Sequence, residues 1–223
     1  KQDLRLDDHP ALQAARGADA LLPVYILDPA QLQPGPLGSR GLGVHRARFL
    51  LESLAALDGA LRQRGSHLLV LQGRAEQLIP QLATRFNLQE VLTLEEIAPQ
   101  ERQQLQQVRA QLGSVALWEQ TGNGLLRRDQ LPCPVAELPA AFTQFRTLVE
   151  QGLQVFQPQP APDYLPHLPE GSEALLTPLP TLSQLGLGEP LSVAASAFPF
   201  SGGEAAASAR LRDYLWDSQN VRH

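Results

Sequence analysis

Short apolar runs recur along the chain at intervals of about 25 to 45 residues. Four of them predict buried β-strands: Leu21–Leu27, His67–Leu71, Glu90–Leu94 and Ser114–Trp118. Turn-forming residues end the first two runs, since Asp28-Pro29 follows one and Gly73 follows the other.

The stretches between these runs have helical spacing. Apolar residues three and four positions apart predict a helix over about 44–64, a second around residues 78–86 and a third that begins near Pro99. The stripes consist of Leu50, Leu54, Leu57 and Leu61; Leu78, Leu82 and Phe86; and Leu105, Val108 and Leu112. The second helix contains Pro80, which we expect to be tolerated only near a first turn.

This alternation predicts an α/β domain over residues 1–150, with helices on both faces of a parallel sheet. The opening residues 1–3 look like the end of a further strand. We therefore expect a five-stranded, doubly wound, Rossmann-like sheet with a ligand crevice at the carboxyl ends of its strands.

The character of the sequence changes after residue 150. Eight prolines fall between residues 151 and 190, with little periodicity. We interpret residues 151–200 as a long Pro-rich connector that either wraps the surface or spans two domains. Residues 201–223 then begin a helical region, with a predicted helix over Glu204–Trp216.

The composition of the chain argues against some classes of function and location. The formal net charge is −5 over 223 residues, so we do not expect the chain to bind DNA directly through bulk positive charge. A single cysteine cannot form an internal disulfide, which favours a reducing compartment, and no apolar run is long enough to span a membrane. We expect a soluble, cytoplasmic protein.

Motifs for catalysis and metal binding are absent from the sequence. No histidine has a partner at metal-ligand spacing, and there is neither a P-loop nor a nucleophile elbow. A cluster after the first predicted strand, Arg5, Asp7 and Asp8, favours a structural interpretation. Arg5 would pair with a neighbouring carboxylate to hold a turn, while Asp8 would cap a helix that begins near Pro10.

The loop over residues 33–44 is rich in glycine and leads directly into a predicted helix. Backbone N–H groups at a helix start attract anions and flat polar ligands, and glycine permits close approach to the backbone. The spacing is not that of a dinucleotide-binding fingerprint, so a mobile surface loop is the alternative.

Several longer segments, in order along the chain, resemble one family. These are Asp3–Leu12 (DLRLDDHPAL), Arg46–Leu54 (RARFLLESL), Phe142–Arg146 (FTQFR), Ala197–Glu204 (AFPFSGGE) and Arg212–Ser218 (RDYLWDS). Together they resemble the N-terminal α/β, or antenna, domain of the photolyase/cryptochrome family, and most of all its DASH class.

The resemblance implies that the catalytic flavin belongs to a second domain. In that family the α/β domain is followed by a helical domain that holds flavin adenine dinucleotide and carries out blue-light-driven DNA repair. The chain ends where the family enters the connection to that domain. We therefore expect neither FAD nor catalysis in this chain alone, although an antenna chromophore such as methenyltetrahydrofolate, deazaflavin or FMN could bind to it.

The resemblance also implies site residues. Gly41, Gly43 and Arg46 match the loop near which flavin-type antennas lie, and Glu96 matches a carboxylate that grips a folate pterin. A carboxylate can accept two parallel hydrogen bonds from an amino-pyrimidine edge. However, Leu92 and Leu94 stand where the family has aromatic residues or histidine. The alternative role for Glu96 is favourable placement before a helix N-terminus.

Three hypotheses follow. The chain is a stand-alone, non-catalytic antenna-type domain, a fragment of a complete cryptochrome DASH, or a module that docks on a separate flavin-domain partner. Because residues at the antenna positions depart from the family pattern, we expect the stand-alone domain. An exposed apolar face on the helix over 204–216 would instead indicate a missing C-terminal domain or partner.

Overall fold

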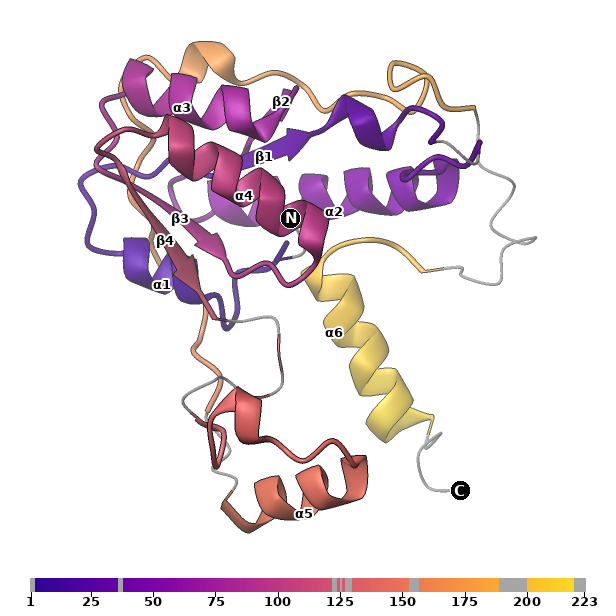
Figure 1. The fold of residues 1–223 in the computed structure, drawn as a ribbon. Helices are drawn as coiled ribbons and strands as arrows, with labels where there is room; N and C mark the ends of the chain where they lie inside the picture. The colour runs from indigo at the N-terminus through magenta and orange to yellow at the C-terminus, as the bar shows by residue number, and fades with distance from the viewer. Residues whose placement is uncertain are drawn as a thin grey trace.

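The computed structural model of the protein describes residues 3–35, 38–121, 124, 126, 130–152, 157–188 and 200–218. Its strands are β1 (Val24–Leu27), β2 (Leu69–Gln72), β3 (Glu90–Leu94) and β4 (Ala116–Gln120) (Figure 1). Its α-helices are α1 (Pro10–Ala15), α2 (Val44–Arg62), α3 (Ala75–Arg85), α4 (Pro99–Gln111), α5 (Phe142–Gly152) and α6 (Glu204–Arg212). Short helical turns lie at Pro29–Gln31, Val135–Glu137 and Glu173–Leu175, and one π-helical turn, Asp213–Asp217, extends α6.

The four predicted strands are confirmed, with small shifts in their bounds. β3 has the predicted bounds, whereas β1, β2 and β4 begin two or three residues later than the apolar runs. In the first run the shift has a clear cause, because Pro23 has no N–H to donate to a ladder and β1 begins only after it.

The α/β architecture with parallel pairing is confirmed, but the described residues do not form a five-stranded sheet. β1 pairs with β2 and β3 pairs with β4, and each pair forms a separate two-stranded parallel sheet. No described strand lies between β1 and β3, and residues 1 and 2, predicted to end a first strand, lie outside the described residues.

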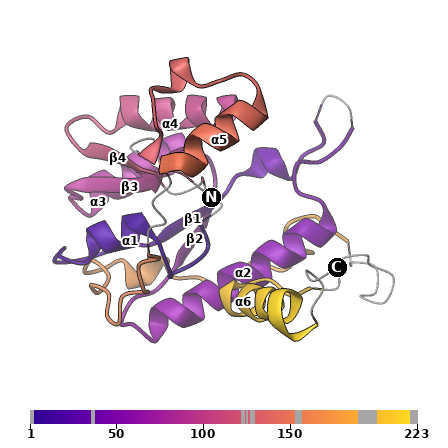
Figure 2. The same cartoon turned by 90° about the horizontal axis from the view of Figure 1, so that it is seen from below.

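The helices cover the strands from two sides. Figure 2 shows the strands between α3 and α4 on one side and α1 and α2 on the other. Two apolar clusters fill these layers. The larger joins α2 to β1 and β2 through residues such as Leu54, Leu27 and Val70, and the smaller joins α3, α4, β3 and β4 around Ala83 and Val108.

Pro80 does not lie in a first turn, contrary to our expectation. α3 begins at Ala75, which places Pro80 inside the helix, where it removes the hydrogen bond that its N–H would donate to the carbonyl of Glu76. The periodic stripe located the helix by its apolar residues, and it missed the polar first turn that precedes them.

The cap of α1 is His9 and not Asp8. The His9 Nδ1 atom accepts the backbone N–H of Leu12 at 3.2 Å. Arg5 holds the turn by donating to the backbone oxygens of Asp7 at 3.1 Å and Asp8 at 3.0 Å. Asp8 itself has a φ of 50°, a left-handed conformation unsuited to the extended N-cap position.

The carboxylates of Asp7 and Asp8 instead bind the Pro-rich segment. Asp7 accepts the N–H of Ala161 at 2.8 Å, and Asp8 accepts the N–H of Gln159 at 3.2 Å. The part of this segment over 157–188 follows the surface and buries leucines in or beside the core, namely Leu165, Leu168, Leu185 and Leu187.

Two glycines bring the start of α6 against α2. The N–H of Gly202 donates to Glu52 at 2.8 Å, and the N–H of Gly203 donates to the Ser53 hydroxyl at 3.1 Å. Gly203 has a φ of 108°, and a Cβ atom there would lie 2.7 Å from the Cβ of Ala56. Only glycine fits this approach without strain.

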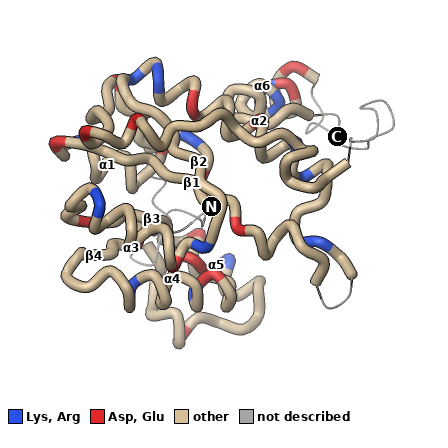
Figure 3. The backbone as a smooth tube through the Cα atoms, turned by 90° about the horizontal axis from the view of Figure 1, so that it is seen from above, with Lys and Arg blue, Asp and Glu red and all other residues tan. Residues whose placement is uncertain are grey.

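Glu204 anchors the first residue of α6 to the opening segment of the chain. Its two carboxylate oxygens accept the backbone N–H groups of Leu6 and Asp7, at 2.8 and 3.0 Å. Beyond this anchor the helix extends away from the strand layers (Figure 1). Charged residues of both signs are interspersed along the backbone in Figure 3, and no described helix is long and apolar enough to cross a membrane.

Candidate functional site at the carboxyl ends of the strands

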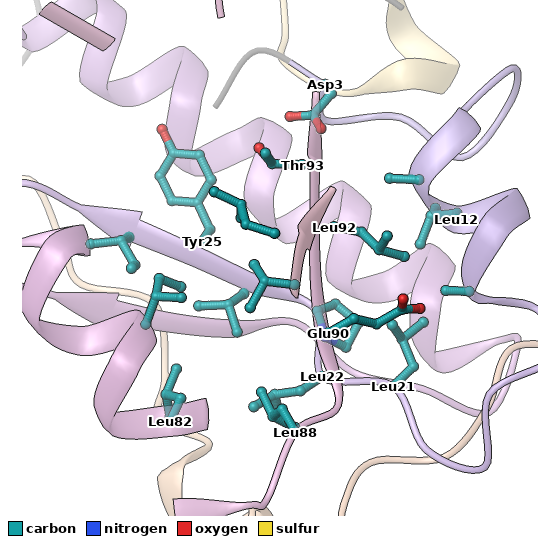
Figure 4. A pocket seen from close by; sticks show the side chains of 18 of the residues that line it. Asp3, Leu12, Leu21, Leu22, Tyr25, Leu82, Leu88, Glu90, Leu92 and Thr93 are labelled. Carbon is teal, nitrogen blue, oxygen red and sulfur yellow. The ribbon is translucent and has the colours of Figure 1, made fainter. Parts of the chain in front are cut away.

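A cavity of 790 Å³ lies between β1 and β3. Its walls are largely apolar, and Figure 4 shows side chains that line it, among them Leu12, Leu21, Leu82 and Leu92. We call this the inter-strand cavity.

Polar side chains gather where β1 and β3 end, at one end of this cavity. Asp28 follows β1, Glu96 follows β3, and Glu101 and Gln104 come from α4; all four line the cavity. We call these four residues the polar mouth. The sequence placed Glu96 at the crevice end of the sheet, and the structure puts it there, half-buried.

Gln104 connects the polar mouth to a buried carboxylate on α3. Its side-chain amide donates to Asp28 at 3.3 Å and to Glu76 at 3.4 Å. Glu76 is only 6% exposed and forms an ion pair with Arg74 at 2.5 Å. These contacts link the end of β1 to both α3 and α4.

The pKa of Glu76 reflects this environment. Burial alone raises the pKa, but the backbone N–H of Glu76, the Gln104 amide and Arg74 outweigh it and hold the pKa below the ordinary value. The carboxylate is therefore ionised and fully occupied by its partners, which makes it a structural group and not a free acid or base.

Tyr25 lies on β1 and also lines the inter-strand cavity, with Asp3 nearby (Figure 4). Burial and the Asp3 carboxylate raise the pKa of Tyr25, while Arg46 acts in the opposite direction. Its hydroxyl is therefore a neutral hydrogen-bonding group at physiological pH.

The glycine-rich loop predicted over residues 33–44, called the glycine loop below, does not contribute to the polar mouth. Neither Gly41, Gly43 nor Arg46 lines the inter-strand cavity, although Arg46 is close enough to influence Tyr25. The Arg46 guanidinium donates to the carbonyl of Gly41 at 2.7 Å, and Gly43 is the N-cap of α2 with no side-chain cap. These contacts give Arg46 and Gly41 a role in closing the loop.

Sequence reasoning missed Asp28, Glu76 and Gln104. The sequence analysis assigned Asp28 to a turn and did not single out Glu76 or Gln104. Positions just after strands could have indicated Asp28, but no local signal marks the other two. Within the described part of the chain no group of three or more side chains that could hold a metal ion occurs.

Comparison with known proteins identifies the family. The sequence model described as DNA photolyase matches residues 1–163. The chain belongs to the DNA photolyase family. This match agrees with the resemblance carried by the motifs at the start of the chain.

The most similar curated relatives include proteins named cryptochrome DASH. That of Gloeobacter violaceus is 37% identical over 226 residues, which cover 100% of this chain and 44% of the relative. That of Natronomonas pharaonis is 34% identical over 227 residues, covering 100% of this chain and 47% of the relative. The chain thus spans less than half the length of these relatives.

Solved structures show the same fold. The cryptochrome of Synechocystis sp. PCC6803 superposes with a TM-score of 0.89 at 29% identity, covering 100% of this chain and 46% of that one. A photolyase of Sulfolobus tokodaii, described with two FAD molecules, gives a TM-score of 0.61 at 23% identity over 75% of this chain and 36% of that one. The second likeness concerns the fold alone.

Proposed function

We propose that this chain is the N-terminal α/β part of a DASH-type cryptochrome and functions together with a flavin-binding helical part. The observation that carries this proposal is the exposed apolar face of α6 and its π-helical extension. Leu211, Tyr214 and Trp216 are 55%, 44% and 63% exposed. An apolar face of this kind, on a helix firmly held at its base by Glu204, supports a docking role.

This observation favours a fragment of a complete cryptochrome DASH, or a module that docks on a separate flavin-domain partner, over a stand-alone domain. A self-contained domain would fold α6 back onto its own core, because exposed aromatic side chains forgo burial free energy. The shorter length of the chain relative to its relatives is consistent with the same view. On this proposal, FAD and light-driven DNA repair belong to the assembled protein.

A chimaera tests the proposal. This chain would replace the matched part of the Gloeobacter violaceus cryptochrome DASH, and the purified chimaera would be assayed for bound flavin by its blue absorption. We expect about one flavin per chain, and dimer repair in damaged DNA under blue light. The chain without the added part serves as the flavin-free control.

Variants of the exposed face sharpen the test. The double variant Leu211→Ser, Trp216→Ser should lose flavin or unfold at a lower temperature, since both residues would lie in the new interface. Val135→Ser is the matched control, because Val135 is 60% exposed but far from α6 in sequence. A folded chimaera that holds no flavin, or equal behaviour of both variants, contradicts the proposal.

For the antenna chromophore we propose Glu96 as the anchoring residue. It is half-buried and lines the polar mouth with Asp28 and Gln104, and a carboxylate suits the amino-pyrimidine edge of a folate. Adding methenyltetrahydrofolate to the chimaera should produce a red-shifted absorption band that Glu96→Gln abolishes. Glu90→Gln, at the amino end of the same strand, is the control that should keep it.

The glycine loop is the alternative site, for FMN or deazaflavin. Here Gly41, Gly43 and Arg46 are the proposed contacts, supported by the uncapped start of α2. Binding of FMN that survives Glu96→Gln but is lost in Arg46→Ala would favour this loop over the polar mouth.

A further inference from the structure

The segment that leads into α6 lies against the middle of α2, although about 150 residues separate the two in sequence. The Arg48 guanidinium donates to the carbonyl of Phe200 at 3.4 Å. It also pairs with Glu52, one turn further along α2, at 3.6 Å. Two of the motif-bearing stretches of the sequence, one on α2 and one before α6, therefore meet in the structure.

The backbone of the next residues lies directly on α2. The N–H of Gly202 donates to Glu52 at 2.8 Å and that of Gly203 to the Ser53 hydroxyl at 3.1 Å. The Ser53 hydroxyl donates in turn to the carbonyl of Phe49 at 2.7 Å. A Cβ atom at position 202 would meet the Phe49 carbonyl oxygen, so no side chain fits between this backbone and the helix.

A second attachment joins the start of α6 to a different element. The Glu204 carboxylate accepts the backbone N–H groups of Leu6 and Asp7, at 2.8 and 3.0 Å. Leu6 is only 2% exposed and belongs to the apolar cluster that also contains buried residues of α2 and β1. This anchor point is therefore fixed to the core by packing.

The body of α6 is also tied back to the segment that precedes it. The Arg210 guanidinium lies 4.9 Å from the centroid of the Phe200 ring and 5.5 Å from that of Tyr214, and it pairs with Asp213. Aromatic rings attract a guanidinium placed over their faces. Phe200 is thus held to α2 through its carbonyl and to α6 through its ring.

A pair of glycines before a helix would ordinarily permit a hinge, because glycine adopts many backbone conformations. Here the N–H groups of both Gly202 and Gly203 are bound to α2, and the following residue is bound to the opening segment. A helix held at points on two separate elements cannot rotate about any one of them without breaking bonds at the other.

We propose that residues 200–204 form a rigid joint, which fixes the direction of α6 relative to the strand layers. The positioning residues are Arg48, Glu52 and Ser53 on α2 and Glu204 at the start of α6. Each acts on the backbone of a distant segment, and their common effect is to prevent α6 from swinging.

The joint has a consequence for the assembled protein, and this consequence rests on the proposed function. α6 extends from the joint and away from the strand layers, with Leu211, Tyr214 and Trp216 exposed on it and its extension (Figure 1). A partner docked on this face would be held at one distance and one angle from the polar mouth, because α2 and β1 share one apolar cluster.

Distances between two spin labels test the joint in the chain itself, with no flavin-binding part required. Cys133→Ser removes the single cysteine, and labels are then placed on Gln63→Cys and Ser208→Cys, which are exposed positions beside α2 and on α6. The reference pair, His45→Cys and Gln63→Cys, spans α2 alone. Labelled chain diluted in unlabelled chain reports distances within one molecule. We expect both pairs to give equally narrow distance distributions.

Variants of the joint give the second readout. The double variant Ser53→Ala, Glu204→Ala removes one acceptor on each side and should widen the distribution across the joint at least about twofold, with the reference pair unchanged. Arg62→Ala is the control, since it breaks only the pair with Asp58 on the same helix.

Two results would overturn the proposal. One is a distribution across the joint that is much broader than the reference in the unmodified joint, a comparison that requires no variant to fold. The other is an unchanged width in the folded double variant. Both are independent of whether the chimaera binds flavin, so the joint and the proposed function can fail separately.

Discussion

At the residue scale, two carboxylates that are withdrawn from water, Glu76 and Glu204, each have several partners. Glu76 has Arg74, Gln104 and its own backbone N–H, and Glu204 has two backbone N–H groups. Such groups become destabilising when one partner is removed, because the remaining charge or dipole stays buried without compensation.

Replacing Glu76 tests this directly. We expect Glu76→Gln to lower the free energy of unfolding by about 1 kcal/mol at neutral pH, because the buried carboxylate loses its charge-assisted contacts with Gln104 and with Arg74, whose own side chain is largely exposed. Since the folded-state pKa of Glu76 is depressed, the wild-type advantage is complete above the ordinary value of 4.5. The advantage then falls as the pH drops through the lower folded-state pKa.

The measurement is urea unfolding of both proteins at about pH 7 and about pH 3. Glu170→Gln, at an exposed position, is the control and should show little difference at either pH. A difference for Glu76→Gln that grows on acidification would contradict the assignment.

Two glycines give opposite predictions for the same substitution. Gly203→Ala should destabilise the contact between α6 and α2, by about 1–3 kcal/mol, because the residue has a φ of 108° and its Cβ would meet Ala56. Gly59→Ala, inside α2 with nothing within 4 Å of the added Cβ, should stabilise by about 0.5–1 kcal/mol. Thermal unfolding of the two variants should therefore shift in opposite directions.

At the scale of elements, apolar periodicity located helices and strands well and their ends poorly. The position of α2 was predicted from the stripe Leu50, Leu54, Leu57 and Leu61. A helix buries one face against the strands only when its apolar residues recur three and four positions apart. Polar ends carry no such signal. The cap of α1 by His9 and the early start of α3 at Ala75 depend on hydrogen bonds that the stripe does not encode.

The anchor of α6 gives a prediction at this scale. Glu204→Ala should expose the backbone N–H groups of Leu6 and Asp7 and accelerate their exchange with deuterium by about tenfold, since both lose their acceptor. Glu173→Ala, an exposed residue at the first position of a short helical turn, should leave these amides unchanged. Unaltered exchange in Glu204→Ala would show that other contacts hold the base of α6.

At the scale of the whole molecule, the described fold has an internal gap and an external apolar face. The inter-strand cavity separates the two described sheets, and Leu211, Tyr214 and Trp216 of α6 and its extension are exposed. The two features differ in kind, because the cavity is bordered by strands that each have one ladder among the described residues, whereas the face consists of side chains.

The exposed face predicts self-association of the isolated chain. Sedimentation at increasing concentration should show oligomers that the variant Leu211→Ser, Trp216→Ser reduces and Val135→Ser does not, because contiguous apolar patches drive association more than single exposed residues. A chain that remains monomeric at high concentration, with Trp216 exposed, would argue against a docking role for α6.

The sequence by itself determined the alternation of strands and helices, the parallel pairing within an α/β fold and, through its ordered motifs, the family. These features depend on local periodicity and on short motifs, which can be recognised in the linear sequence. The position of Glu96 at the carboxyl end of β3 also followed, because a residue after a strand lies at that edge of the sheet.

Only the tertiary structure decided which distant groups meet. The contacts of Gln104 with Asp28 and Glu76, of Glu204 with Leu6 and Asp7, and the cavity between β1 and β3 join segments far apart in sequence. Such contacts arise from packing of whole elements, so no window of neighbouring residues contains them.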